Sequence, residues 1–364
     1  MNFTYLSKQG ILRCLAFCIS ICTLLQLTAQ ETAARPEQTI NDSVSNQKVT
    51  WWASVITEMP WNINDGKVGW ANYIDVGAEI GLWKGASLNL DAIATYEYHN
   101  PVLDDLQYFS NITIGSNRAF RLMQLELAQK FGSHWIVSLG LRNIDVDYFT
   151  SPYTSLFTGT SHTSIPTLSG NFTVATAPIA ALGLHLEYTP IENLTIKETL
   201  YNGVADDRLN RQFRFCPKGD GILNTLSIHY ADNEHFDYSF GSIMGNKPSF
   251  NYALWLIAEQ QLFHISKCPV GLLLQGSIAP KPESYCTHYW GAGINCKEIG
   301  NMEAQVGVAV NRMIVADGRE TDVELTASLP VWDYLTLQPA LHWINTSGTH
   351  HAAALIRASF EFGN

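Results

Sequence analysis

The chain has 364 residues, of which 11% are aromatic and 15% charged, and its formal net charge is −11 at pH 7. The charged fraction is below the roughly 25% usual for soluble domains, and a mean hydropathy of −0.01 argues against a bundle of membrane-spanning helices. The excess of carboxylates disfavours nucleic acid as a partner, because a polyanion would be repelled.

The first 30 residues have the organisation of a secretory signal peptide. Lys8 and Arg13 precede an apolar stretch, residues 14–29, and a polar segment follows it. This order predicts export, with cleavage near Ala29. A membrane anchor is the alternative, but the apolar stretch is short for a bilayer span and no stop-transfer pattern follows it. Loss of both basic residues with the signal would make the mature chain more acidic.

We expect three segments along the chain. Residues 1–30 are the signal peptide, residues 31–48 a short polar leader in the periplasm, and residues 49–364 a single outer-membrane β-barrel domain. No repeat of fixed period and no low-complexity block interrupts the third segment. The division depends on the pattern that begins at residue 49.

From residue 49 onward, hydrophobic residues alternate with polar or small ones. The clearest example is LGLHLEY, residues 182–188, in which leucines and a tyrosine alternate with Gly183, His185 and Glu187. A period of two predicts a strand with one apolar and one polar face. The same pattern occurs in several other segments: 88–98, 135–142, 303–310, 322–329, 335–343 and 354–362.

The connections between these segments favour a membrane barrel over a soluble sandwich. Very short connections alternate with longer ones, which we place at about 59–71, 99–120, 149–180, 202–222, 244–250, 280–286, 313–319 and 345–351. Outer-membrane barrels alternate short periplasmic turns with longer outer loops in this way. We therefore predict an all-β fold: a transmembrane antiparallel β-barrel of about 16 strands. The leucines of 182–188 would face lipid, and His185 and Glu187 a wet lumen.

Several segments resemble the carbohydrate-selective porins of bacterial outer membranes, the OprB family. The strongest resemblance is APIAALGLHLEYTPIENLTIKETLYNG (177–203). The others are FRLMQLELAQKF (120–131), SLGLRNIDVDYFTSPYTSLF (138–157), LTLQPALHWINTSGTH (335–350) and ALIRASFEF (354–362). His185 stands where the family more often has arginine, and Gly363 and Asn364 follow the terminal aromatic residue. The resemblance implies passive diffusion of sugars across the outer membrane of a Gram-negative bacterium, with lipid and lipopolysaccharide around the barrel and no cofactor.

The third long loop is the candidate for the channel constriction. In porins this loop folds into the barrel, and its hydroxyl and aromatic side chains suit a sugar. Charged residues lie at its start and on the following strand. We therefore expect these residues to line the pore: Arg142, Asp145, Asp147, Tyr153, Phe157, His185 and Glu187. The alternatives are a loop on the outer surface, and charges that only solvate a wide lumen.

Two other functions fit a barrel of this size. One is an outer-membrane hydrolase, although the sequence contains no G-x-S-x-G and no H-E-x-x-H motif. The other is a plugged barrel with a structural or adhesive function. The sequence predicts no metal site. It leaves open the identity of the sugar, whether passage is selective or only limited by size, and the oligomeric state.

Four cysteines remain after the predicted signal peptide: Cys216, Cys268, Cys286 and Cys296. The predicted topology places Cys268 and Cys296 at the turn side of neighbouring strands, and Cys216 and Cys286 at the loop side. If disulfides form, we expect the pairs Cys268–Cys296 and Cys216–Cys286, the first in preference to the second. Free thiols at strand ends are the alternative.

Overall fold

The structure is a computed structural model, and it describes residues 49–364 apart from 114, 116, 207, 233–234 and 300–302. The predicted signal peptide and leader lie outside the described residues.

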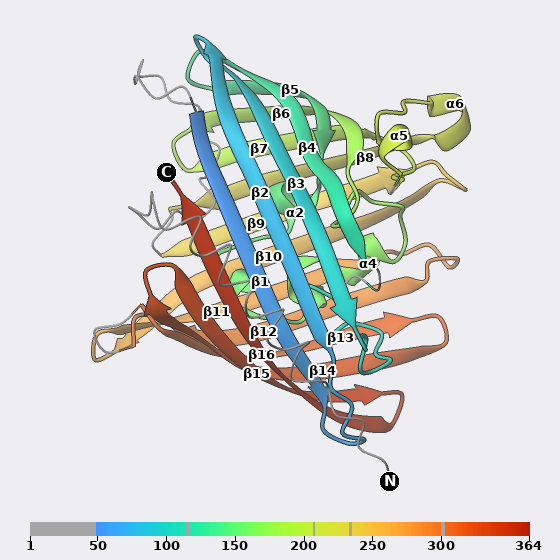
Figure 1. Cartoon of the computed structure of the whole chain (residues 1–364). Coiled ribbons are helices and arrows are strands. Elements are labelled where there is room, and N and C mark those ends of the chain that lie inside the picture. Colours follow the sequence, from blue (N-terminus) through green and yellow to red (C-terminus); the bar gives the residue numbers. More distant parts are fainter. Residues whose placement is uncertain (1–48, 114, 116, 207, 233–234, 300–302) are drawn as a thin grey trace.

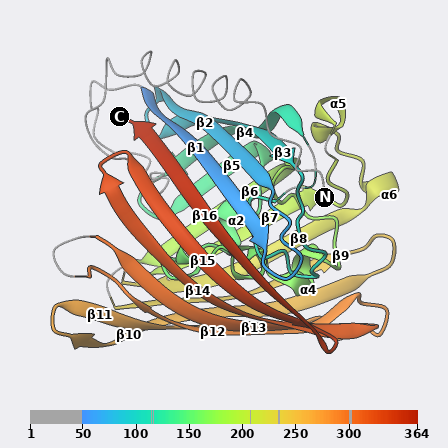
Figure 2. The same ribbon diagram turned by 60° about the horizontal axis from the view of Figure 1, so that its bottom comes forward.

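Across this part of the chain, sixteen antiparallel strands close into one barrel (Figures 1 and 2). Each strand pairs with its neighbours in sequence, and β1 closes the barrel against β16. The strands are β1 (Val49–Asn62), β2 (Trp70–Trp83), β3 (Ala86–Tyr98), β4 (Arg118–Phe131), β5 (Trp135–Arg142), β6 (Ala181–Ile191), β7 (Leu194–Asn202), β8 (Ile222–Ala231), β9 (Phe236–Gly245), β10 (Asn251–Ile265), β11 (Cys268–Ile278), β12 (Cys286–Cys296), β13 (Gln305–Val315), β14 (Gly318–Trp332), β15 (Leu335–Thr346) and β16 (Thr349–Gly363). This confirms the predicted fold class.

Closure of the barrel depends on the pairing of its first and last strands. In the register of β1 and β16, Trp52 lies opposite Gly363 and Asn62 lies opposite Ala353. The two terminal strands are therefore hydrogen-bonded along most of their length. A closed sheet has no unpaired edge, so its backbone groups are satisfied without water, as a bilayer requires.

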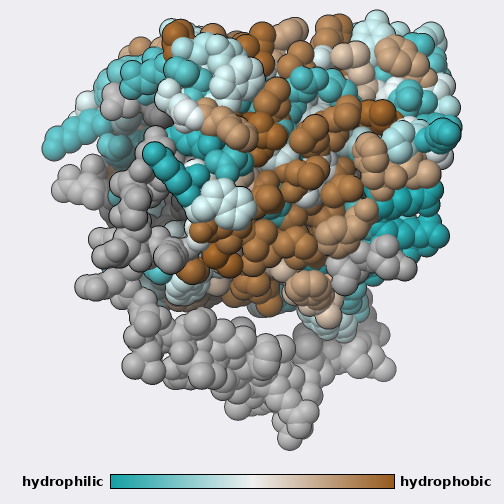
Figure 3. Space-filling view, turned by 90° about the horizontal axis from the view of Figure 1, so that it is seen from above, coloured by the Kyte–Doolittle hydropathy of each residue, from teal (hydrophilic) through white to brown (hydrophobic). Residues whose placement is uncertain are grey.

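The alternation of side chains follows the prediction. Leu184 points outward and is 48% exposed, whereas its neighbour His185 points inward and is 1% exposed. Outward apolar side chains lie side by side around the barrel: Leu139, Leu184, Ile228, Phe240, Leu256, Leu274, Ile294, Val308, Leu325, Leu341 and Ile356. On the face seen in Figure 3, hydrophobic residues form a broad band between more hydrophilic margins. This outer surface matches the hydrocarbon layer of a bilayer.

Aromatic side chains border the outer apolar surface at both ends of the strands. The belt on the turn side contains Trp135, Tyr188, Tyr230, Tyr238, Trp332 and Tyr334. Trp135 and Tyr188 stack there with their ring centroids 4.1 Å apart. The belt on the loop side contains Trp61, Trp70, Tyr96, Tyr98, Trp290 and Trp343. Two such belts are typical of the two interfaces of a membrane barrel.

Replacing Leu184 with arginine tests the outward orientation of β6. Leu184 lies between Leu139 of β5 and Leu200 of β7, near the middle of the wall. We expect the Leu184→Arg barrel to lose roughly 2–4 kcal/mol of stability in a bilayer, because an arginine on the lipid-facing surface must be desolvated. Urea unfolding in lipid vesicles measures this loss. The Leu184→Met control should unfold like the natural chain, and an unchanged midpoint for Leu184→Arg would contradict the assignment.

The connections differ from the prediction at four points. The connections at 316–317 and 347–348 are tight two-residue turns, because β13 to β16 extend through the segments that we expected to be loops. The connection 297–304, expected to be short, is longer than these. The third loop begins at residue 143 instead of 149, because β5 ends at Arg142. Strict alternation of short and long connections therefore does not hold in the last quarter of the barrel.

Short helices occur in two of the long loops. The third loop, L3 (residues 143–180), contains α2 (Asp145–Tyr148), η1 (Thr154–Leu156), α3 (Thr160–Thr163) and α4 (Pro166–Ser169), and the fourth loop, L4 (residues 203–221), contains α5 (Leu209–Gln212) and α6 (Pro217–Asp220). Among the described residues, no helix combines the length and the apolar character needed to cross a bilayer.

One of the two predicted disulfides is present. Cys268, at the start of β11, is bonded to Cys296, at the end of β12, with their Cα atoms 6.0 Å apart. This confirms the first predicted pair. The second pair is wrong, because Cys216 and Cys286 are free. Cys216 caps α6 in L4, whereas Cys286 is buried where L3 packs on β12 through Asn171.

The two free thiols should differ strongly in reactivity. Cys286 is fully buried, whereas Cys216 is partly exposed beside Arg214, whose hydrogen bond lowers the pKa of the Cys216 thiol. We expect a maleimide to label Cys216 in the folded protein and Cys286 only after unfolding. The reagent reacts with the thiolate form and must have access to the sulfur atom. Mass spectrometry of peptides from labelled protein measures this difference. Equal labelling rates in the folded state would contradict it.

Candidate permeation site

L3 folds into the barrel and packs against the inner wall, as predicted. Its apolar side chains are buried: Ile144, Tyr148, Phe149, Tyr153, Phe157, Ile165, Leu168 and Phe172. They meet apolar residues on the inward faces of β8 to β13, among them Trp255, Ile257 and Leu273. Burial of this many large apolar side chains stabilises the inward position of the loop. The barrel therefore has an apolar core inside its wall, on the side of β8 to β13.

Glycines on the inner wall make room for the aromatic residues of L3. A Cβ atom at Gly271 would lie 2.1 Å from the ring of Tyr153, and one at Gly307 would lie 3.1 Å from the ring of Phe157. Any larger residue at position 271 would collide with this ring. The rings of Tyr153 and Phe157 thus pack directly against the backbone of β11 and β13.

Buried carboxylates on the inner wall accept hydrogen bonds from the backbone of L3. Glu259 of β10 accepts N–H groups of Tyr153 at 2.8 Å and Thr154 at 3.2 Å. Glu324 of β14 accepts N–H groups of Thr158 at 2.7 Å and Gly159 at 3.1 Å. Hydrogen bonds to a charged acceptor are stronger than those between neutral groups. They fix the central part of L3 at two points, on β10 and β14.

The second loop, L2 (residues 99–117), also folds inward, which the sequence analysis did not predict. The N–H groups of Leu106 and Gln107 each donate to Glu320 of β14 at 2.9 Å. The apolar side chains Val102, Leu103 and Phe109 pack against β15 and β16. Two backbone hydrogen bonds join L2 to L3, from Asn111 to Thr158 and from Thr160 to Tyr108. The two loops together cover the inner wall from β8 to β16.

A chain of hydrogen bonds beneath L3 has the residue types of a catalytic triad. Thr158 Oγ1 lies 3.0 Å from His342 Nε2, and His342 Nδ1 lies 3.0 Å from Asp322. Thr158 and His342 are both fully buried, and Thr158 Oγ1 also donates to Glu324. A nucleophile must reach its substrate, and no substrate can approach this threonine. The arrangement holds L3 to β14 and β15.

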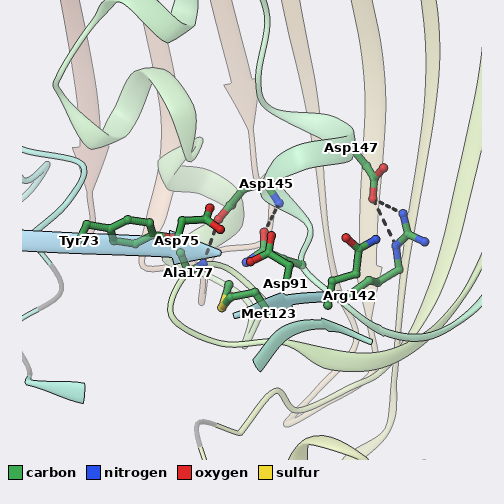
Figure 4. Close-up of a pocket in the computed structure, with 10 residues that line it drawn as sticks. Tyr73, Asp75, Asp91, Met123, Arg142, Asp145, Asp147 and Ala177 are labelled. Atoms are coloured by element: carbon green, nitrogen blue, oxygen red, sulfur yellow. Dashed lines mark hydrogen bonds and ion pairs between the residues drawn. The ribbon is translucent and has the colours of Figure 1, made fainter. Parts of the chain in front are cut away.

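A polar cavity lies on the opposite side of the lumen, between L3 and strands β2 to β5. This eyelet cavity has a volume of about 100 Å³. It is lined by Tyr73, Asp75, Asp91, Met123, Gln124, Arg142, Asn143, Asp145, Asp147 and Ala177. Figure 4 shows side chains of the wall facing α2 across this space. The lining consists mainly of groups that hydrogen-bond.

Arg142 is the basic residue of the eyelet cavity, and it is held between two carboxylates. Its guanidinium is ion-paired with Asp147 of α2, as Figure 4 shows, and with Glu126 of β4. Burial raises the pKa of the Asp147 carboxyl, but the charge of Arg142 outweighs this effect and holds the pKa below its usual range. The pair fixes the first turn of L3 against β5.

Asp145 links the start of L3 to its end through hydrogen bonds. Its Oδ2 accepts the N–H of Ala177 at 2.9 Å, and its own N–H donates to Asn143 Oδ1 at 2.7 Å (Figure 4). The start of L3 is therefore tied to the segment that leads into β6. This positions the Asp145 carboxylate on the wall of the eyelet cavity.

The predicted pore residues separate into two groups. Arg142, Asp145 and Asp147 lie together on the eyelet cavity. The others are packed away from it. Phe157, 1% exposed, and Tyr153 belong to the apolar core.

His185 and Glu187 point to the inside, as parity predicted, but L3 covers His185. The His185 ring packs against Tyr148 and its Nδ1 lies 2.7 Å from Thr199 Oγ1. Glu187 is half-buried, 4.0 Å from the same ring.

Sequence reasoning missed the cavity residues on β2, β3 and β4. Asp75 and Asp91 occupy inward positions in their strands, and Asp91 stood at a polar position of the predicted alternation. Strand parity could therefore have identified it as a lumen residue. It could not have shown which part of the lumen stays open.

A closed barrel of sixteen strands whose third loop folds inward beside a polar cavity is the architecture of porins. No family model matches the sequence, and a search of curated proteins returns no match.

Solved porin structures share the fold. The high-pH structure of OprB from Pseudomonas putida superposes with a TM-score of 0.74 at 13% identity, over 87% of this chain and 94% of that chain. The low-pH structure of the same protein has a TM-score of 0.60 at 15% identity, over 86% of this chain and 93% of that chain. A triple mutant of Rhodopseudomonas blastica porin has a TM-score of 0.58 at 10% identity, over 86% of this chain and 100% of that chain. At these identities the likeness establishes the fold alone.

Proposed function

We propose that this protein is an outer-membrane porin that lets sugars diffuse passively through the eyelet cavity. The observation that supports this function best is the polar eyelet cavity between L3 and strands β2 to β5. Its aspartates, Asn143 and Gln124 offer hydrogen-bond donors and acceptors, and Tyr73 offers an aromatic face. Sugars present hydroxyl groups and C–H faces that match such a lining. The resemblance to OprB-type porins in sequence and in fold supports the same function.

We place the barrel in the outer membrane of a Gram-negative bacterium, in contact with lipid and lipopolysaccharide. The apolar outer surface and the two aromatic belts support this location. Export through the predicted signal peptide, residues 1–30, would deliver the chain to the periplasm. Transport needs no cofactor in this proposal, since diffusion follows the solute gradient.

Among the predicted pore residues, we assign Arg142, Asp145 and Asp147 to contact with the permeant. Tyr153, Phe157 and His185 act indirectly in this proposal, because they hold L3 in place and so set the width of the passage. Glu187, half-buried beside His185, belongs with this supporting group.

The two alternative functions receive less support. A hydrolase would need an accessible nucleophile, and the threonine with triad-like partners is fully buried. A plugged barrel would need L2 and L3 to fill the lumen, but the eyelet cavity remains between L3 and β2 to β5.

Liposome swelling tests the proposal directly. Vesicles that contain the purified protein should take up monosaccharides. The sugar concentration inside should rise to the outside concentration and not above it. In a planar bilayer, single channels should carry a steady current. Absence of both swelling and current would favour a plugged barrel, and uptake above the outside concentration would exclude passive diffusion.

A further inference from the structure

The eyelet cavity, through which we propose that permeants pass, is bordered by an excess of negative charge. Of the ten residues around the eyelet cavity, four are aspartates and one is an arginine: Asp75, Asp91, Asp145, Asp147 and Arg142. The arginine does not balance these charges, because its guanidinium is shared by Asp147 and by Glu126 behind it. The positive charge on the cavity wall is thus already matched by two carboxylates.

The neighbouring wall does not supply enough basic residues to reverse this excess. Arg121 of β4 lies opposite Ile93, two residues from Asp91 along β3, so its charge offsets one carboxylate. Arg118, farther along β4, lies opposite Thr95, beside the inward Glu97 of β3. Lys197 of β7 also acts on Asp147, but it lies opposite Glu187 of β6. Around the eyelet cavity, Arg121, Arg142 and Lys197 therefore stand against six carboxylates: Asp75, Asp91, Asp145, Asp147, Glu126 and Glu187.

The two inward loops add no positive charge. L3 places Asp145 and Asp147 on the eyelet cavity, and neither L2 nor L3 contains a lysine or an arginine. Both loops pack through apolar side chains against β8 to β16. A narrow aqueous path beside a low-dielectric body concentrates the field of the charges that line it.

We infer that this passage selects by charge: it favours neutral and cationic solutes, such as amino sugars, over anionic solutes such as uronates. The inference rests on the proposed channel function and adds a permeant class to it. The residues that we hold responsible are Asp75 and Asp91 on the wall and Asp145 on L3. Fields of several kT predict a preference for small cations over small anions on the order of tenfold.

The experiment measures the reversal potential of single channels in a planar bilayer with a tenfold gradient of KCl. We expect the natural chain to show a permeability ratio of K⁺ to Cl⁻ well above one. The double variant Asp75→Asn/Asp91→Asn should lower this ratio several-fold, because both changes remove a negative charge and preserve side-chain size. The matched control is Glu361→Gln, which removes an exposed carboxylate of β16 that does not line the cavity.

Liposome swelling with sugars of similar size provides the second readout. Swelling rates should decrease in the order glucosamine, glucose, glucuronate. In the double variant, the difference in rate between glucosamine and glucuronate should be smaller. A current with a ratio near or below one would overturn this inference and leave the porin function intact, as would equal effects of the double variant and the control. Absence of any current would overturn the proposed function together with this inference.

Discussion

Replacing Arg142 with methionine is expected to destabilise the folded barrel by about 3–5 kcal/mol, because the change leaves two buried carboxylates without their partner. The side chains of Glu126 and Asp147 are 0% and 9% exposed, so water solvates them poorly in place of the guanidinium. Methionine keeps much of the volume of arginine, and the loss therefore reports mainly on the charge. Urea unfolding in detergent micelles, followed by tryptophan fluorescence, measures it.

The control for Arg142→Met is Arg319→Met, which removes an exposed arginine at the loop-side end of β14. That variant should unfold within about 0.5 kcal/mol of the natural chain. The stability of Arg142→Lys should lie between those of Arg142→Met and Arg319→Met, since one ammonium cannot reproduce the contacts of a guanidinium with two carboxylates. Equal stability of Arg142→Met and the control would show that the ion pairs do not hold L3 to β5.

The ion pair between Arg142 and Asp147 should persist in mild acid. The folded-state pKa of Asp147 is held below its usual range by Arg142. A depressed pKa means that the unfolded chain takes up the proton first as pH falls. The stabilising contribution of Asp147 is therefore complete above the ordinary carboxyl range and is lost only as pH falls through that range and below it.

The strands could be predicted because their two faces meet different solvents. Leu184 and its neighbours meet lipid and His185 does not, and this difference repeats every second residue. Parity identified the inward face of β6 correctly. It did not indicate that Tyr148 of L3 would cover His185, because that contact joins residues far apart in the sequence.

The apolar core inside the barrel was harder to predict. On β10, the inward Trp255 and Ile257 alternate with the outward Leu254 and Leu256, so that both faces of the strand are hydrophobic. This continuous apolar run was a signal that something other than water covers the inner face. The inward fold of L3 was predicted, but the strands that L3 covers were not, because loop packing depends on contacts among many strands.

The inward course of L2 had a weaker signal still. Its anchor is Glu320, which occupies an ordinary polar position in the alternation of β14. The same strand position in an open channel would face water. Only the folded arrangement distinguishes a carboxylate that binds backbone N–H groups from one that lines a pore.

Replacing Glu324 with alanine is expected to release the middle of L3 from the wall and to widen the channel. Glu324 accepts the buried N–H groups of Thr158 and Gly159 and the hydroxyl of Thr158. Each buried donor that loses its acceptor costs about 1–3 kcal/mol, so docking of L3 should weaken by roughly 2–5 kcal/mol. The conductance of single channels should rise, because L3 would then spend time away from its inward position.

Proteolysis reports on the loop independently of the current. L3 contains no lysine or arginine but does contain Tyr153 and Phe157, so chymotrypsin and not trypsin is the suitable protease. Glu324→Ala should be cut there faster than the natural chain, since both rings are buried when L3 is docked. Glu303→Ala, which removes an exposed carboxylate before β13, is the matched control. If Glu324→Ala and this control show the same conductance and the same cleavage rate, Glu324 does not hold L3, and the position of the loop must depend on the apolar core and on its other anchors, Glu259 and Arg142.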